Sequence, residues 1–499
     1  MRRRVARVVA VGLAGLVTAA GLAAVAQGAM AAATTPRLIP GPQRWTAGPA
    51  DYTFTPGARI VVLDERLVGT ARVFAADLWA LTGVSVEWTL GGEVRPGDIA
   101  LNLGAVNGAE GYRLTIASTV DIRGAEAGVF YGTRTMLQLL RQSWRVAGGV
   151  AEDWPAYPER GLMLDAGRKY FSLSFLRKQI RELAYLKMNY LHLHLSDNLG
   201  FRLESATHPE VTSERHYTKT EIRELIEYAA RYHVQVVPEI DFPGHMDAIL
   251  SSHPELKLVS RNGVVSDGFI DLSKPDAYTL MRDLLTEFLP LFPGRYWHIG
   301  ADEYVADYAD YPQLGGKDSY HRFINWANEI VRAAGKITRI ANDGLKPGGA
   351  TVAIDSDIVV EHWSASGPGG LPWVGPAYSP RQLVAAGHRV MNRSFTPTYF
   401  TTGGPASPFN VSPGVMYDAW QPNLFVDGST LPTADRARNL GSEVSVWCDA
   451  PEALTEEQIA DKLPNRLRVM AQHTWGSPKV APLYLLFLPM INAVGAAPA

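Results

Sequence analysis

The sequence has little cysteine, and Cys448 is its single thiol among 499 residues. One cysteine cannot form an intramolecular disulfide, so stability must come from a buried core. Beside Trp447, the thiol is expected to pack as a small apolar group and not to act as a nucleophile. Hydrophobic residues make up 46% of the chain and charged residues 19%. This composition excludes a fibre or a disordered chain and is typical of two or three globular domains.

The sequence also lacks an excess of basic residues, and its formal net charge is -3 at pH 7. Because nucleic-acid-binding proteins usually carry a basic patch or a high net positive charge, we expect no nucleic acid partner. Four arginines among the first seven residues contribute to this balance. If they are removed with an N-terminal segment, the remaining chain becomes more acidic.

Long apolar runs are absent after the N-terminal segment, so no later part of the chain is expected to span a membrane. In residues 1–32, the arginines precede an apolar run and then small residues, an order typical of a secretory signal peptide. We therefore expect this segment to be cleaved and the mature protein to be secreted, without membrane attachment. An N-terminal membrane anchor is the alternative, although the apolar run is short for a spanning helix.

Residues 36–150 mix short strand-like runs with helical stretches, which predicts a small α+β domain. After the prolines at 155 and 158, residues 155–490 alternate apolar strand patterns with amphipathic helix patterns. Such repeated alternation predicts an α/β fold of the TIM type, a (β/α)8 barrel. In the first domain, strands are expected at 59–63, 98–103, 112–116 and 120–123 and helices at 70–82 and 127–142. In the barrel, strands are expected at 161–164, 190–195, 234–239 and 296–299 and helices at 175–186, 219–232, 277–288 and 323–334.

Polar side chains follow five of the expected barrel strands, at the point where each strand ends. In barrels of this type the active site forms from the strand ends and the loops after them, so these side chains are expected to meet on one face. Any one of them has a structural explanation, such as a salt bridge or a helix cap, but the five positions together favour a functional site. The residues are Arg168, Asp197, the group Glu239, Asp241 and His245, the pair Asp302 and Glu303, and the pair Glu361 and Trp363.

The adjacent acids Asp302 and Glu303 are the strongest single signal. They come directly after the apolar, aromatic run 296–299, which predicts a buried strand that ends in paired carboxylates. Neighbouring side chains on a strand point to opposite faces, but in the turn just beyond it both can reach one pocket. There, different surroundings can separate the two pKa values, as acid/base chemistry requires. The alternative for such a dipeptide alone is a surface loop.

Five segments across residues 155–480 occur together in a characteristic order. They are RGLMLDAGRKY at 160–170, KMNYLHLHLSD at 187–197, PEIDFPGH at 238–245, HIGADE at 298–303 and VWCD at 446–449. In this combination the chain resembles glycoside hydrolase family 20, the β-N-acetylhexosaminidases and their relatives. The small domain before the barrel resembles the usual N-terminal partner in this family by its arrangement.

The resemblance implies a retaining hydrolysis of terminal β-linked N-acetylhexosamine, GlcNAc or GalNAc, in an oligosaccharide or glycoconjugate, without a cofactor or metal ion. The acetamido oxygen of the substrate attacks the anomeric carbon and gives an oxazolinium intermediate. By position, Glu303 is the general acid and then the base that activates water. Asp302 orients the acetamido nitrogen and balances its positive charge, and Tyr399 holds the acetamido oxygen.

The resemblance also implies how further residues serve the sugar. Arg168 matches the arginine that binds sugar hydroxyls, for which its fixed fork of donors is suited. Trp363 and Trp447 match the apolar walls of the acetamido pocket and the sugar ring. Asp197 and His245 match a hydrogen-bonded pair behind the acid, which is able to tune its pKa.

Three positions depart from the family pattern around the sugar. Ala341 stands where many members have tryptophan, Thr401 where aspartate is common, and Asp449 in place of a longer glutamate. These changes either weaken the grip on a terminal monosaccharide or make room for a second sugar. The second possibility is a lacto-N-biosidase, which releases a galactosyl-N-acetylglucosamine disaccharide by the same chemistry. Trp420 is then a candidate to face the extra sugar, with loop packing as its alternative.

Two hypotheses from other classes stay open at this point. A metal-dependent barrel hydrolase is suggested by histidines near strand ends, but no compact set of histidine and carboxylate ligands with metal spacing is evident. A noncatalytic glycan-binding protein is the other, although binding alone does not require a general acid such as Glu303. The histidines in question are His192, His194, His245, His298 and His362.

Overall fold

The computed structural model describes residues 36–366 and 376–499. Residues 37–499 belong to one unit, whose elements are given below. The expected signal peptide, residues 1–32, lies outside the described residues, so its cleavage and the secretion of the chain stay predictions. No helix in the described part of the chain combines the length and the apolar character needed to cross a bilayer.

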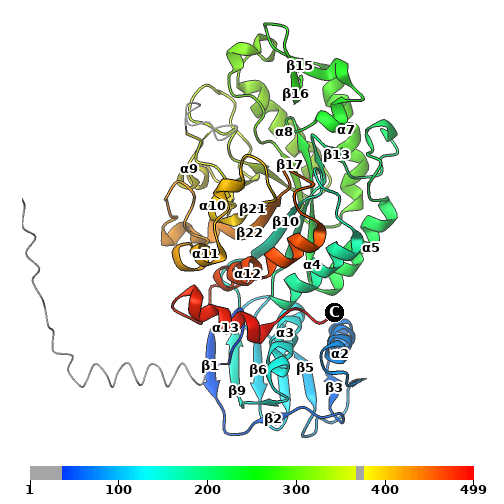
Figure 1. Ribbon diagram of the computed structural model, residues 1–499, viewed down its shortest axis with the longest axis vertical. Coiled ribbons are helices and arrows are strands. Elements are labelled where there is room, and N and C mark those ends of the chain that lie inside the picture. Colours follow the sequence, from blue (N-terminus) through cyan, green and yellow to red (C-terminus); the bar gives the residue numbers. More distant parts are fainter. Residues whose placement is uncertain (1–35, 367–375) are drawn as a thin grey trace, which may run out of the picture. The chain divides into compact units, whose positions relative to one another are not determined.

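The N-terminal region contains, within the described residues, a seven-stranded mixed sheet in the order β1-β9-β6-β7-β5-β3-β4. Helices α2 (Val68–Thr82) and α3 (Glu126–Gln142) pack against this sheet and against each other (Figure 1). Burial alternates along β6 and β7, as expected where one face of a sheet is covered. The strands are β1 (Arg44–Ala47), β3 (Arg59–Val62), β4 (Glu87–Leu90), β5 (Ile99–Leu103), β6 (Tyr112–Ile116), β7 (Val120–Gly124) and β9 (Gly149–Asp153), and β2 (Tyr52–Thr53) pairs with β8 (Arg145–Val146).

A closed barrel of eight parallel strands follows in the described part of the chain. The last barrel strand, β22, pairs with β20 on one side and with β10 on the other, which closes the barrel. The short β21 (Tyr399–Thr401) also pairs with β22, at its C-terminal end. The eight strands are β10 (Glu159–Asp165), β11 (Tyr190–His194), β14 (Gln235–Phe242), β17 (Tyr296–Gly300), β18 (Ile337–Ala341), β19 (Val359–His362), β20 (Arg389–Asn392) and β22 (Asn439–Trp447).

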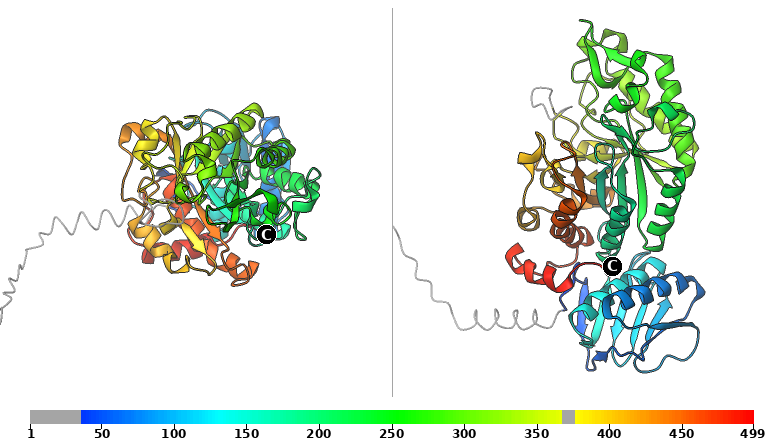
Figure 2. Two further views of the ribbon diagram at one scale, coloured as in Figure 1. Left: turned by 90° about the horizontal axis from the view of Figure 1, so that it is seen from above. Right: turned by 45° about the vertical axis from the view of Figure 1, so that its right-hand side comes forward.

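Helices lie on the outside of these strands, as Figure 2 shows from two further directions. Several begin at a side-chain cap that satisfies a free backbone N–H of the first turn, such as Ser172 before α4 and the Thr218–Glu221 capping box at α5. Three of the four expected barrel helices agree with the structure to within two residues, and α8 begins five residues earlier than expected. The main helices are α4 (Leu173–Tyr185), α5 (Lys219–Arg231), α7 (Pro275–Phe288), α8 (Asp318–Ala333), α9 (Pro380–Ala385), α12 (Glu456–Trp475) and α13 (Tyr484–Val494).

A buried carboxylate at the end of β9, Asp153, connects the N-terminal region to the barrel. It accepts hydrogen bonds from the backbone N–H of Gln43 at 3.0 Å, the hydroxyl of Tyr112 at 2.6 Å and the indole N–H of Trp475 in α12 at 2.6 Å. The ammonium group of Lys187, between α4 and β11, lies 2.8 Å away. Because Asp153 and Lys187 are both buried, each depends on the other for charge compensation.

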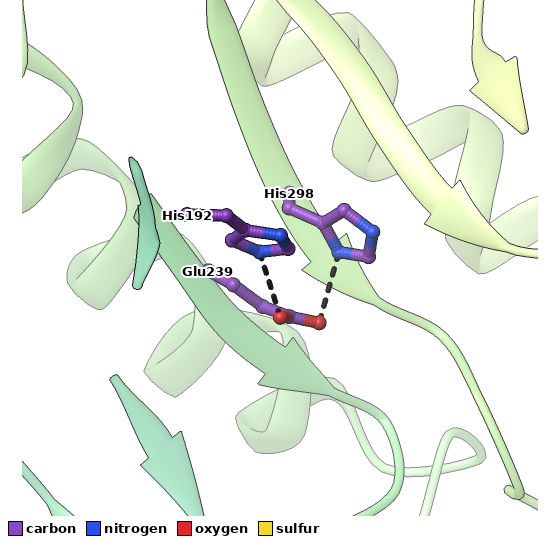
Figure 3. A group of neighbouring side chains, drawn as sticks. All are labelled: His192, Glu239 and His298. Atoms are coloured by element: carbon purple, nitrogen blue, oxygen red, sulfur yellow. Dashed lines mark ion pairs between the residues drawn. The ribbon is translucent and has the colours of Figure 1, made fainter. Parts of the chain in front are cut away.

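Charged side chains occupy the barrel interior, where layers of aliphatic side chains are usual. Glu239 of β14 lies between His192 of β11 and His298 of β17, with 2.9 Å from a carboxylate oxygen to each ring (Figure 3). The other ring nitrogens face Glu443 at 3.1 Å and Glu361 at 3.4 Å. Two buried arginines lie against these acids and offset their charge: Arg339 and Arg393.

Candidate active site

The loop after β17 brings both acids of the Asp302–Glu303 pair to one cavity. Gly300, Ala301 and Glu303 have left-handed backbone angles, with φ of 67°, 66° and 50°. For the two L-residues this costs roughly 1–3 kcal/mol each, so surrounding contacts must hold the loop in place. The turn ends the strand alternation, and the two adjacent side chains therefore reach the same space.

The cavity lies at the C-terminal ends of the barrel strands and has a volume of about 160 Å³. The polar residues expected after β10, β14 and β17 meet here, together with aromatic residues that follow β19 and end β22. Ala406 also lines the cavity, and nothing in the sequence pattern marks it. The lining residues are Arg168, His245, Asp302, Glu303, Trp363, Tyr399, Thr401, Ala406, Trp447 and Asp449.

A buried pair stands behind the acids. His245 lies with one ring nitrogen 3.5 Å from Asp197, and with the other 3.4 Å from Glu303 and 3.7 Å from Asp302. Burial alone lowers the pKa of His245, but the Asp197 carboxylate and the two acids raise it well above its ordinary value. Burial raises the pKa of Glu303, and His245 more than offsets this, so that the pKa is lowered. At neutral pH the free site therefore holds an imidazolium beside a Glu303 carboxylate.

Arg168 connects three carboxylates on the same side of the cavity. Its guanidinium lies 3.0 Å from Asp165, 2.9 Å from Asp197 and 3.9 Å from Asp449. These acids raise its pKa although burial opposes the charge. The guanidinium also lies over the ring of Trp447, 5.3 Å from its centre. The arginine is thus fixed in position, while its side chain stays 16% exposed toward the cavity and able to donate to a ligand.

Three aromatic side chains also line the cavity. Tyr399 stacks on Trp363 with ring centres 6.3 Å apart and planes 15° apart, and its ring centre lies 5.8 Å from that of Trp447. Burial raises the pKa of Tyr399, so its hydroxyl keeps its proton and is a hydrogen-bond donor at neutral pH. A cavity lined by aromatic rings and charged groups together suits a sugar ring with an amide substituent.

Asp343, after β18, supports the acidic loop and was not singled out as a site residue from the sequence. It accepts hydrogen bonds at 2.9 Å from the backbone N–H of Glu303 and at 2.9 Å from the indole N–H of Trp363. Burial, followed by the charges of Asp302 and Glu303, raises its pKa to about 8. Asp343 follows a barrel strand, as the other acids of the site do, and this position in the sequence could have identified it as a site residue.

Residues 157–478 match the family described as glycosyl hydrolase family 20, catalytic domain, and residues 35–154 match glycosyl hydrolase family 20, domain 2. The chain belongs to glycosyl hydrolase family 20. The resemblance carried by the five sequence segments is therefore confirmed, and so is the predicted barrel after a small N-terminal domain.

Named relatives of this family 20 chain include two kinds of glycosidase. A lacto-N-biosidase of Bifidobacterium bifidum is 29% identical over 464 residues, which cover 89% of this chain and 40% of that protein. A β-N-acetylhexosaminidase of Cellulomonas fimi is 29% identical over 460 residues, covering 85% of this chain and 86% of that protein. A mutant Streptomyces plicatus β-hexosaminidase, solved with its product GlcNAc, has a TM-score of 0.75 at 27% identity and covers 92% of this chain and 94% of that one.

Several of the expected positions do not line the cavity of this family 20 chain. Asp197 is buried behind it, and Glu239, Asp241 and Glu361 lie buried within strands β14 and β19 and not in the loops after them. Trp420 is buried, donates its indole N–H to the carbonyl of Leu424 at 2.9 Å and packs edge-on against His473. Its packing fixes it in the loop after α11 (Pro413–Ala419), so the expectation that it faces an additional sugar is not met in this structure. Ala341 is buried at the end of β18, whereas Thr401 and Asp449 do line the cavity.

Compact groups of histidines and carboxylates do exist in the barrel, contrary to the expectation from the sequence. One is the group of His192, Glu239 and His298 in Figure 3. Both nitrogens of each ring already face a carboxylate. Burial alone would lower the pKa of His298, but the charges of Glu239 and Glu361 raise it to about 9. Because a metal ligand must be a neutral imidazole, the raised pKa of His298 favours charge pairing over metal binding in this group.

Proposed function

We propose that this chain is a secreted, retaining glycosidase that removes terminal β-linked N-acetylhexosamine, GlcNAc or GalNAc, from glycans by substrate-assisted catalysis. The observation that carries the proposal is the cavity in which Asp302, Glu303 and Tyr399 meet beside the two tryptophans 363 and 447. The hexosaminidase names of the Cellulomonas and Streptomyces relatives support it. Secretion rests on the sequence of residues 1–32.

In the first step, the acetamido oxygen of the substrate attacks the anomeric carbon while the bond to the leaving oxygen breaks. Glu303 gives its proton to that oxygen, and the sugar becomes an oxazolinium ion. Asp302 accepts the amide N–H and offsets the positive charge that develops on the ring. The Tyr399 hydroxyl donates to the acetamido oxygen and keeps it in line for attack.

In the second step, Glu303 takes a proton from water, whose oxygen attacks the anomeric carbon and opens the oxazolinium ring. Two displacements at the same carbon leave its configuration retained. The lowered pKa of Glu303 suits this base role, while the first step requires a proton on the same group. His245, 3.4 Å away and charged at neutral pH, is positioned to share a proton with Glu303 as the sugar displaces water.

Lacto-N-biosidase activity is the second candidate function, and one observation favours it. Thr401, which stands where aspartate is common in the family, and Ala406 present small side chains on the cavity wall. A smaller wall leaves space for a second sugar beyond the N-acetylhexosamine. The Bifidobacterium relative has this activity in its name, but this chain spans 40% of its length, so its substrate does not transfer by itself.

The acid role is tested by Glu303→Gln, which keeps the size of the side chain but removes its proton transfer. We expect kcat/KM on an aryl β-N-acetylglucosaminide with a poor leaving group to fall by about 10²–10⁴-fold, the usual contribution of general acid–base catalysis. Affinity for a thiazoline analogue of the intermediate should change little by comparison. The matched control is Asp307→Asn, an exposed acid of the same loop that does not line the cavity. Equal activity of Glu303→Gln and the wild type would refute the assignment.

The two specificities are separated by one assay of p-nitrophenol release, without added galactosidase. Faster release from the β-N-acetylglucosaminide is the expected result and supports monosaccharide removal. Release from the β-lacto-N-bioside alone would overturn that choice and assign disaccharide removal. Release from neither substrate, with a folded protein, would count against the family activity in this chain.

A further inference from the structure

Two surface turns with the same sequence pattern lie side by side outside the active-site cavity. The tripeptide His-Pro-Glu occurs at residues 208–210 and 253–255, each time leading into a one-turn helix, η2 (Pro209–Val211) and η3 (Pro254–Leu256). His208 and His253 have nearly the same backbone angles, with φ/ψ of -132°/68° and -130°/56°. The turns therefore present their imidazoles in a similar way, with ring centres 5.9 Å apart.

One carboxylate oxygen lies between the two rings. Glu210 Oε1 is 2.9 Å from His208 Nδ1 and 3.0 Å from His253 Nε2, and one donor atom from each residue lies within 4.8 Å of the others. A tetrahedral Zn²⁺ ion with bonds of 2.0–2.1 Å holds its nitrogen and oxygen ligands about 3.3 Å apart. The two distances from Glu210 Oε1 to the imidazole nitrogens therefore lie within a few tenths of an ångström of the spacing that the ion requires.

The far nitrogen of each ring also faces a carboxylate. His208 Nε2 lies 3.3 Å from Asp283 of α7, and His253 Nδ1 lies 3.5 Å from Glu255. Histidines that bind metals usually donate their second N–H to such a group, which fixes the ring orientation and makes the ligand nitrogen more basic. Here Asp283 gives His208 such a hydrogen-bonded partner, and Glu255 lies within ion-pair distance of His253.

Exposure to solvent distinguishes these three side chains from the buried groups of the barrel. The side chains of His208, Glu210 and His253 are 18%, 41% and 20% exposed. An ion from solution can reach them, and water can occupy a fourth position. The group of His192, Glu239 and His298 in Figure 3 is, by contrast, buried in the barrel interior.

We propose that His208, Glu210 and His253 form a binding site for one divalent transition-metal ion, with Zn²⁺ as the best match to two imidazoles and one carboxylate. The ion links the loop after β13 (Gly200–Phe201) to the loop after α6 (Asp247–Leu250). These loops follow the segments that carry Asp197 and His245. None of the three ligands lines the cavity, so the site stabilises the barrel end and takes no part in hydrolysis.

The test is calorimetric titration of ZnCl₂ into the purified, EDTA-treated and dialysed chain, beside the variant His208→Gln/His253→Gln. We expect one equivalent of Zn²⁺ to bind the wild type and the dissociation constant of that equivalent to rise at least 100-fold in the double variant. Asp283→Asn should weaken binding about 10–100-fold, the usual effect of removing a group that supports a ligand histidine. Zn²⁺ should raise the Tm of the wild type by a few degrees and not that of the double variant.

His216→Gln is the matched control, because His216 lies on the same loop and donates its Nδ1–H to the carbonyl of Ser213 at 2.8 Å. It should bind Zn²⁺ like the wild type. Binding that is equally strong in the wild type and the double variant would place the ion elsewhere, for example at His245 and the acids, and overturn the proposal. Absence of binding to the wild type would also overturn it and leave the three residues as a hydrogen-bonded surface cluster. Hydrolysis by the double variant should equal that of the wild type, which shows that it is folded.

Discussion

Among single residues, His245 controls the charge of Glu303. Its imidazolium stands 3.4 Å from the carboxylate and is the largest influence that lowers the pKa of Glu303 against the opposing effect of burial. In His245→Asn the positive charge is gone while burial persists, so the pKa of Glu303 must rise. We therefore expect Glu303 to titrate at a higher pH in His245→Asn than in the wild type.

The shift is measured by a pH titration of carboxyl groups with infrared difference spectroscopy, in which the signal absent from Glu303→Gln is assigned to Glu303. His216→Gln, far from the acids in sequence and outside the cavity lining, should leave that signal at the wild-type pH. A Glu303 signal that stays or moves to lower pH in His245→Asn would show that His245 does not hold the carboxylate in its charged form.

The sequence predicted the location of those site residues that the end of a strand positions, and not of those that a loop positions. Arg168, Asp302 and Glu303 follow strands directly, so the barrel geometry alone brings them to one face. Asp343 also follows a strand, but its contacts depend on the backbone of the neighbouring acidic loop. Trp420 comes from an irregular loop, where nothing in the sequence separates burial against His473 from exposure to a ligand.

The element that positions the acids is the turn from β17, and Gly300 is the residue that permits it. Its φ is 67°, and a Cβ atom at this position would lie 1.7 Å from the Asp241 carboxylate and 3.0 Å from the Asp241 Cα. In Gly300→Ala the turn must move, and Asp302 and Glu303 move with it. Because a displacement of about 1 Å in an active site can cost 10²-fold in rate, we expect kcat/KM to fall at least that far.

Gly315→Ala is the control for backbone strain alone. Gly315 lies farther along the same connection with a φ of 65°, and a Cβ atom there meets nothing within 4 Å. It should cost about 1–2 kcal/mol of stability in urea unfolding and leave kcat/KM near the wild-type value. If both variants keep full activity, the acids do not depend on the geometry of this turn.

The pattern of elements was readable from the sequence as far as β17 and α8, and less so afterwards. Up to there, apolar strands and amphipathic helices alternate, and although long connections follow β11 and β14, the expected strand and helix ranges agree closely with the structure. Beyond residue 334, the described part of the chain contains irregular segments and short helices between β20 and β22. Periodicity has too few residues to act on in such segments, so their course depends on tertiary contacts.

For the whole molecule, the buried network around Asp153 couples the N-terminal region to the barrel. Lys187 of the barrel has a pKa lowered by burial, and Asp153 is the main influence that opposes this. Tyr112 of the N-terminal sheet and Trp475 of α12 donate to the same carboxylate. Since the donors come from both regions, unfolding of either region would expose the Asp153 carboxylate or leave it without some of its hydrogen-bond donors. We therefore expect the two regions to unfold in one transition.

Asp153→Ala tests this coupling, because it leaves Lys187, Tyr112 and Trp475 without their shared acceptor. Breaking a buried pair from one side usually costs about 3–5 kcal/mol, and Lys187 limits the cost by losing its proton. The adjacent Glu152 pairs with Arg44 at 3.6 Å on the surface, so Glu152→Ala should cost at most about 1 kcal/mol. The free energies of unfolding in urea, followed by circular dichroism and by tryptophan fluorescence, check both values. Equal effects of the two substitutions, or two separate transitions in the wild type, would mean that the barrel and its N-terminal partner are held together elsewhere.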